Sequence, residues 1–179
     1  MAANHGHHDC GGHVLGSAVH QTLDEMEFER GLWSAALTGQ TDDIENRIEK
    51  GDDVNATDKS GYTALHYAAR SGHIQVCRLL LRHGANVNAT TNTGHATPLQ
   101  RAAYMGHQSV VQLLLQHKAD PLAVDTDGMT ALHKAVERGH EDTVKLLLTS
   151  SPALKDVQDV KGRIPADMTT NPHLKSLLR

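Results

Sequence analysis

The sequence predicts an all-α protein built as a solenoid of tandem helix–turn–helix repeats. Two observations predict this fold. A segment of about 33 residues recurs along the chain, and each copy joins a short Thr-initiated helix to a leucine-rich second helix. Of 179 residues, 39% are hydrophobic but only 3% are aromatic. We therefore expect a core of Ala, Leu and Val, in which small residues let neighbouring helices approach closely.

The repeat period follows from three aligned segments. Gly61–His73 recurs as Gly128–His140, and Gly94–His107 lies between them with one extra residue before Thr97. The first leucines of these segments, at 65, 99 and 132, are 34 and 33 residues apart. Each copy continues into three consecutive leucines, at 79–81, 113–115 and 146–148. The period is therefore that of a tandem array.

Start and stop signals place two helices in each copy. A threonine precedes the first helix, where its hydroxyl can accept a backbone N–H, and a glycine follows it. Pro98 occupies a first helical position, where its missing N–H costs nothing. The predicted first helices are 64–70, 98–105 and 131–138, and the predicted second helices are about 74–83, 108–117 and 141–149. Such short pairs cannot bury an apolar face alone, so we expect them to be stable only when stacked.

The first and last copies differ from the middle ones. At second-helix positions that are apolar in the middle copies, the first has Asp43 and Arg47, which we expect to form an ion pair on a wet face. Trp33 stands where the other copies have a helix-opening His or Gln. The predicted organisation is a His/Gly-rich disordered tail (1–20) and a repeat domain (21–179), with repeats at about 28–57, 58–90, 91–124 and 125–157 and a partial cap at 158–179.

The shared segment resembles a known signature. Gly-x-Thr-Pro-Leu-His-x-Ala-Ala-x-x-Gly-His, followed by a leucine-rich helix and Gly84–Ala89, resembles the ankyrin repeat family over roughly residues 28–178. The resemblance implies an ankyrin-repeat solenoid with N- and C-terminal capping repeats. It also implies a non-catalytic module that binds another protein. By the same resemblance, several histidines tie adjacent repeats together through hydrogen bonds to backbone, with Gln100 replacing one of them: His66, His73, His107, His133 and His140.

In this fold the fingertips and the exposed side of the first helices are expected to line a concave groove. The positions that vary between copies are the predicted partner-binding residues. Tyr62, Tyr104, Met105 and Met129 are large groups of the kind enriched at interfaces, and we expect them to be anchors. The alternative is that isolated exposed apolar residues are ordinary. The full predicted set is Lys59, Tyr62, Arg70, His95, Tyr104, Met105, Met129, Glu137 and Arg138.

A second functional hypothesis concerns the N-terminal segment. It holds four imidazoles, a thiol and a carboxylate within nine residues, which could chelate Zn²⁺ or Cu²⁺. It lacks the paired-ligand spacing of a structural zinc site, so the competing interpretation is a disordered tail with adventitious metal affinity. The candidate ligands are His5, His7, His8, Cys10 and His13.

Other classes of function find less support. No nucleophile, phosphate-binding or paired-acid motif is present, so we expect no enzyme activity, no cofactor and no small-molecule substrate. The net charge of −4 and the mixed charges of the groove argue against nucleic acid. The longest aliphatic runs are too short to span a membrane. We expect a monomer, and the two cysteines, Cys10 and Cys77, fit a reducing cytoplasmic or nuclear compartment.

One modification site is suggested by the resemblance alone. Asn55 and Asn88 occupy the position that an asparaginyl hydroxylase modifies in some ankyrin proteins. Asn88 has a leucine eight residues upstream (Leu80) but lacks the acidic residue two positions before. Hydroxylation of Asn88 is therefore a hypothesis.

Overall fold

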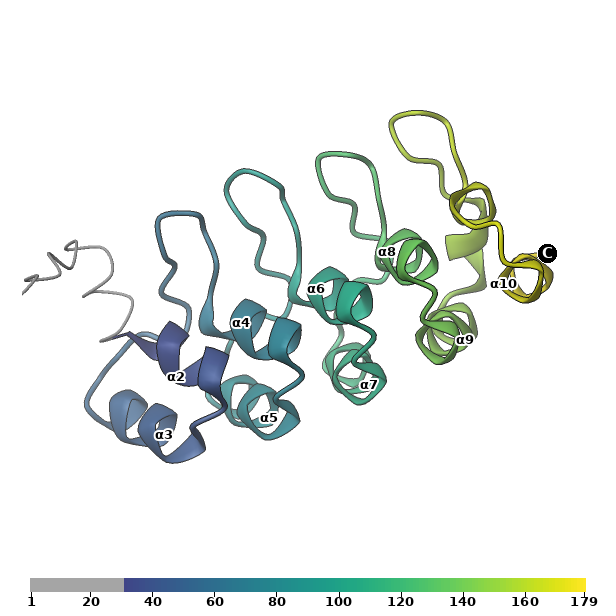
Figure 1. The fold of residues 1–179 in the computed structure, drawn as a ribbon. Helices are drawn as coiled ribbons and strands as arrows, with labels where there is room; N and C mark the ends of the chain where they lie inside the picture. Colours follow the sequence, from purple (N-terminus) through teal and green to yellow (C-terminus); the bar gives the residue numbers. More distant parts are fainter. Residues whose placement is uncertain (1–30) are drawn as a thin grey trace, which may run out of the picture.

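A computed structural model describes residues 31–179, which form a row of stacked helix pairs (Figure 1). The pairs are α2 (Leu32–Thr38) with α3 (Thr41–Glu49), α4 (Ala64–Ser71) with α5 (Ile74–Arg82), α6 (Pro98–Met105) with α7 (Gln108–Gln116), and α8 (Ala131–Arg138) with α9 (Glu141–Ser150). Two 3-10 helices, η1 (Pro152–Asp156) and η2 (Pro165–Met168), and the short α10 (Pro172–Leu177) follow. The all-α repeat solenoid is confirmed, and the helices of the three middle copies lie within one residue of their expected bounds.

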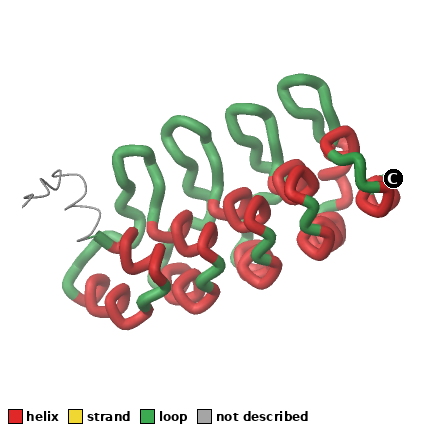
Figure 2. Tube along the Cα trace, in the orientation of Figure 1, coloured by secondary structure: helices red, strands yellow, loops and turns green. Residues whose placement is uncertain are grey.

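The helices form two rows. Each of α2, α4, α6 and α8 contacts the next to make the inner row, and α3, α5, α7 and α9 make the outer row. Long loops, which we call fingers, project from the stack (Figure 2). They cover residues 50–63, 83–97, 117–130 and 157–164. The inner helices and the fingers therefore share one side of the molecule.

Polar side chains start the inner helices as expected. The Thr97 hydroxyl accepts a hydrogen bond from the backbone N–H of Gln100 (3.3 Å), and Gln100 returns one by accepting from the N–H of Thr97 (2.9 Å). The residue in the place of Gln100 is His66 in α4 and His133 in α8. Their Nδ1 atoms accept from the N–H of Thr63 and of Thr130, each at 3.1 Å. These reciprocal bonds satisfy donors that a helix start leaves unpaired.

The same residues tie each repeat to the next finger. In His66, Gln100 and His133 one polar atom faces the threonine, and a nitrogen of the same side chain lies at a backbone carbonyl 29 or 30 residues further on, whereas the single ring nitrogen of Trp33 reaches a carbonyl 23 residues further on. The bonds are Trp33 to Ala56 (3.0 Å), His66 to Ala96 (2.9 Å), Gln100 to Met129 (2.8 Å) and His133 to Arg163 (3.3 Å). The indole of Trp33 has only a donor, so it makes the bond to the carbonyl but cannot accept at the helix start. Gly31 precedes α2, which therefore begins without a side-chain cap.

A second set of histidines ties each repeat back to the preceding one. His73, His107 and His140 follow the glycines that end the inner helices. Their Nε2 atoms lie 3.0 Å from the carbonyl oxygens of Leu37, Arg70 and Tyr104 respectively. The expectation that histidines join adjacent repeats through backbone bonds is thus confirmed for both sets.

The core lies between the two rows and is built from small and aliphatic residues. Ala68, Ala102 and Ala135 are fully buried on the inner helices, so neighbouring backbones approach closely. Leu80 and its equivalents on the outer helices are buried beneath them. Burial raises the pKa of the Cys77 thiol to about 12, so this cysteine packs as a small hydrophobe.

The first pair is confirmed as a more polar end of the stack, because α3 buries only Ile44. The expected pairing of Arg47 with Asp43 needs correction. The ion pair shown for Arg47 is with Asp52, at 3.7 Å, because the turn after α3 brings Asp52 back beside the helix end. The predicted tail (1–20) and residues 21–30 lie outside the described residues, and the repeat boundaries stay predictions. Among residues 31–179 no helix has the length and apolarity needed to cross a bilayer.

Two glycines test how closely successive repeats pack. Gly106 and Gly139 end α6 and α8 with φ of +78° and +77°. A Cβ on Gly106 would lie 2.6 Å from Nδ1 of His140, whereas a Cβ on Gly139 would meet no atom within 4 Å. We predict that Gly139→Ala lowers the free energy of unfolding by about 1 kcal/mol, the cost of the left-handed backbone alone. Gly106→Ala should cost about 2 kcal/mol or more, because the His140 bond to Tyr104 is also lost. Urea denaturation measures both, and equal losses would contradict the close approach.

Candidate functional site

The fingers and the inner helices border a surface that we call the groove surface. Its side chains come from the finger positions just before each inner helix and from the outward positions of α4, α6 and α8. Seven of the nine predicted partner-binding residues are exposed on these elements: Lys59, Arg70, His95, Tyr104, Met105, Glu137 and Arg138. The other two, Tyr62 and Met129, are placed differently.

The expectation that Met129 is an exposed anchor is wrong. Its side chain is only 9% exposed, and its sulfur lies 3.1 Å from Nζ of Lys134. The reason is its position at the base of the finger, where the chain turns into α8 and the Lys134 side chain lies against it. Met129 therefore belongs to the structure beneath the groove surface.

Tyr62 is half-buried and fixed by its neighbours. Its ring centroid lies 5.5 Å from those of His66 and Tyr67, and the Cζ of Arg101 lies 5.0 Å above it. Nη2 of Arg101 also donates a hydrogen bond to the Tyr62 hydroxyl. These contacts make Tyr62 a rigid wall of the groove surface.

Tyr104 and Met105 form its exposed apolar part. They end α6 and are 36% and 43% exposed. The Cζ of Arg138, on the next inner helix, lies 5.0 Å from the centroid of the Tyr104 ring, which orients the ring through a cation–π contact. An ordered aromatic ring loses little conformational freedom on binding, a property useful at an interface.

Three aspartates that sequence reasoning missed shape the fingers. Oδ1 of each accepts hydrogen bonds from two backbone N–H groups of its own finger, those of residues two and four positions further on. Oδ2 of each binds a side-chain donor: the Tyr67 hydroxyl at 2.6 Å, the Lys134 ammonium at 2.7 Å and the Arg163 guanidinium at 2.7 Å. The aspartates are Asp58, Asp125 and Asp159. Their repeated Asp-x-x-Gly spacing is the sequence signal that could have found them.

The second finger departs from this pattern. Thr91 occupies the aspartate position, and its hydroxyl accepts from the N–H of Ala96 at 3.1 Å. The extra residue is accommodated at His95, whose φ is +49°. Arg101, on α6, stands where Tyr67 and Lys134 stand in the neighbouring repeats. Neither Arg101 nor Lys134 was among the predicted site residues.

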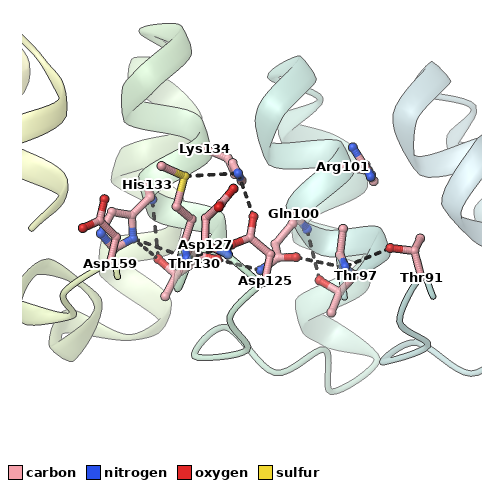
Figure 3. Close-up of polar contacts among 12 residues, drawn as sticks. Thr91, Thr97, Gln100, Arg101, Asp125, Asp127, Thr130, His133, Lys134 and Asp159 are labelled. Carbon is pink, nitrogen blue, oxygen red and sulfur yellow. Dashed lines mark hydrogen bonds and ion pairs between the residues drawn. The ribbon is translucent and has the colours of Figure 1, made fainter. Parts of the chain in front are cut away.

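A cavity of about 240 Å³ opens on the groove surface between the second and third fingers. Arg101 and Tyr104 line it from α6, Lys134 from α8, and Asp125 and Asp127 from the third finger. Figure 3 shows Arg101 and Lys134 projecting from neighbouring inner helices, with Lys134 joined to Asp125 and with Thr91 beside Thr97, away from the Arg101 guanidinium. The cavity therefore joins the second and third full repeats.

The pKa values of His66 and Tyr67, which lie beneath the groove surface, are displaced. Burial lowers the pKa of His66 to about 4, opposed by its bond to the Ala96 carbonyl. Because Nδ1 accepts from a backbone N–H, the neutral ring carries its proton on Nε2. Burial, aided by the hydrogen bond to Asp58, raises the pKa of Tyr67. Both groups are thus neutral near pH 7 and serve as hydrogen-bonding groups.

The alternative metal ligands, His5, His7, His8, Cys10 and His13, lie outside the described residues. Within residues 31–179 no group of three or more His, Cys, Asp or Glu side chains could hold a metal ion. Asn88 is exposed. Its amide donates to the Lys118 carbonyl (3.3 Å) and accepts from the Asp120 N–H (2.9 Å), so it joins two fingers. Its hydroxylation stays a prediction.

With the stacked pairs and fingers described, the chain can be compared with known proteins. The family model described as ankyrin repeats (3 copies) matches residues 1–91, 32–125 and 88–159. The chain belongs to the ankyrin repeat family, as its repeat signature indicated.

Individual relatives match only in part. Ankyrin repeat domain-containing protein 39 from Homo sapiens is 53% identical over 79 residues, which are 44% of this chain and 42% of that protein. Its Bos taurus counterpart is 58% identical over 55 residues, 31% of this chain and 30% of that protein. Palmitoyltransferase akr1 from Schizosaccharomyces pombe is 54% identical over 106 residues, 59% of this chain but 16% of that protein. The matched stretch thus spans less than half of each of these relatives.

Burial of neutral His66 predicts acid sensitivity. Its folded-state pKa of about 4 lies below the ordinary 6.5, so below pH 6.5 the unfolded chain binds the proton more readily. The stabilisation is complete above pH 6.5 and is lost as the pH falls towards 4, by up to about 3 kcal/mol. His133, whose pKa burial also lowers, acts in the same direction.

Gln100 shows that a glutamine can make the same bonds without titrating. His66→Gln should therefore keep the stability measured at pH 7 and flatten its decline between pH 6.5 and 4.5. Urea denaturation across this range tests the effect, with His133→Gln as the parallel variant. An unchanged pH slope in both variants would show that these rings are not the source of acid sensitivity.

Proposed function

We propose that this chain is a non-catalytic adaptor that binds a partner protein through the groove surface. Ankyrin repeats as a class are protein-interaction domains, and the chain belongs to that family. The observation that supports this use of the surface is the exposed pair Tyr104 and Met105, of which Tyr104 lines a cavity of about 240 Å³. Aromatic and Met side chains beside a concave site are typical of binding hot spots.

The repeated hydrogen bonds explain why this surface can vary. The helix-opening and helix-ending residues and the finger aspartates use their polar atoms to hold the stack together. Outward positions such as 70, 104 and 137 carry no comparable structural role for their side chains. Arg70, Tyr104 and Glu137 occupy the same position in successive repeats, yet they differ completely in chemistry. Side chains that differ from repeat to repeat on a regular backbone are suited to recognising one particular partner.

The groove surface carries charges of both signs, which would orient a bound partner rather than attract any molecule of one charge. Arg70 and Arg138 are exposed on the groove surface together with Glu137 and Asp127, so the surface carries both cations and anions. A nucleic acid would favour a continuous basic stripe. A polypeptide with its own mixed charges is the more complementary occupant.

Replacing Tyr104 and Met105 by alanine tests the groove surface directly. Tyr62 is less suitable for substitution because its ring packs against His66, Tyr67 and Arg101 and supports the fold. Tyr104→Ala/Met105→Ala should leave helicity and the melting temperature close to wild type, because both side chains are exposed. Affinity purification from cell lysate with the full chain as bait, quantified by mass spectrometry, should show about tenfold less of the specific partner, the effect of removing a hot spot.

The matched control is Gln112→Ala/Lys145→Ala, which truncates two exposed side chains on the outer helices α7 and α9. It should retain the partner at the wild-type level. Equal recovery with both double variants would place the binding site elsewhere.

A further inference from the structure

The four fingers differ in the residue at their base. In three of them this residue is an aspartate whose carboxylate binds a nearby side chain, that of Tyr67, Lys134 or Arg163. Lys134 is thereby paired with Asp125 at 2.7 Å, and the carboxylate side chain is only 7% exposed. Arg101 occupies the equivalent position on α6, but the second finger offers it Thr91, which has no charge. Compared with the third full repeat, this repeat therefore lacks the acidic residue but has a cationic residue at the equivalent helix position.

The contacts of Arg101 show the consequence. Within the described residues it has no carboxylate partner, and its Nη2 donates to the neutral Tyr62 hydroxyl. Its Nε is a buried side-chain nitrogen that makes no hydrogen bond within residues 31–179. A buried donor without an acceptor is unfavourable, more so on a charged group. Arg101 thus retains unused hydrogen-bonding capacity beside the cavity that it lines.

The charges facing the cavity define what would complement it. Arg101 and Lys134 face it from the inner helices, and Asp125 and Asp127 face it from the third finger. Asp125 already neutralises Lys134. Asp127 is exposed at the other side of the cavity and disfavours a ligand with two negative charges. A hydrogen-bond acceptor with a single negative charge, placed beside Arg101, would therefore complement the cavity best.

We propose that Arg101 binds a Glu or Asp side chain of the partner polypeptide, and that the Thr91 finger is the device that leaves it free to do so. A small rotation of the guanidinium into the cavity would let a carboxylate accept from Arg101 in the two-bonded geometry that arginine favours. Tyr104, at the rim of the same cavity, would pack against the methylene groups of that side chain. This inference rests on the proposed function and adds the chemistry of one subsite.

The test uses a random peptide library displayed on phage and selected on the full-length chain. Peptides enriched by the wild type should carry an acidic residue at a constant position, and selection on Arg101→Gln should lose that preference. Glutamine removes the charge and keeps an unbranched polar side chain at this position. Lys145→Gln, which removes one charge from the outer helix α9, is the matched control and should enrich the same peptides as the wild type.

One enriched peptide is then synthesised with its acidic residue or with the corresponding amide. For the wild type, calorimetry should show binding weakened by about tenfold or more on this change, because a buried charge loses its partner. For Arg101→Gln the two peptides should bind alike, which is the coupling that a double-mutant cycle isolates.

A second variant tests the role of the finger. Thr91→Asp restores the aspartate of the other repeats and should pair with Arg101 internally. The acidic peptide should then bind about tenfold more weakly, by loss of the same charge pair, while the amide peptide changes little. Thermal melting of the variant checks its fold, and Arg101→Gln carries the test if Thr91→Asp fails to fold.

The outcomes separate this inference from the proposed function. Peptides that depend on Tyr104 and Met105 but show no preference for an acid, or that bind Arg101→Gln as tightly as the wild type, overturn the carboxylate subsite and leave the groove surface in place. Enriched peptides that bind Tyr104→Ala/Met105→Ala unchanged overturn both.

Discussion

The bond from each helix-opening side chain to the next finger is the interaction on which the rest of the structure depends. The paired helices have only seven to ten residues each and are too short to be stable alone. One side chain therefore both starts an inner helix and fixes the position of the following repeat. His66, Gln100 and His133 do this with two polar atoms, and Trp33 does half of it at the first repeat. Stability and repeat geometry are set by the same groups.

This use of polar residues explains which surface is available for recognition. The histidines that follow the inner helices, and Asn55 and Asn88 in the fingers, also form hydrogen bonds with backbone atoms of a neighbouring repeat. What remains variable is the outward face of α4, α6 and α8 and the finger positions beside it. The fourteen histidines of the chain first suggest metal or acid–base chemistry, but five of those in the repeats act as hydrogen-bonding links: His66, His73, His107, His133 and His140.

The second finger differs from the other fingers in length and in the residue at its base. An extra residue at His95 and the exchange of aspartate for Thr91 occur together, and both change the surroundings of Arg101. A finger that keeps its aspartate neutralises the cation facing it, as Asp125 does for Lys134. The second finger has no acid to neutralise Arg101, and Arg101 lines the cavity, so the cavity is the place where the charges of this repeat differ from those of the next. Local irregularity in a regular array is where natural proteins place function.

The sequence by itself determined the repeat, the helices and their caps, because a period of 33 or 34 residues, Thr at helix starts and Gly at helix ends act over a few neighbouring residues. It also placed the groove positions, since register in a solenoid follows from the period. Only the tertiary structure decided the state of individual side chains. Met129 is buried against Lys134, and the ring of Tyr62 is held by Arg101. The contact between Tyr62 and Arg101 joins two repeats, and the contact between Met129 and Lys134 depends on how the finger turns into α8, so no local sequence pattern encodes either of them.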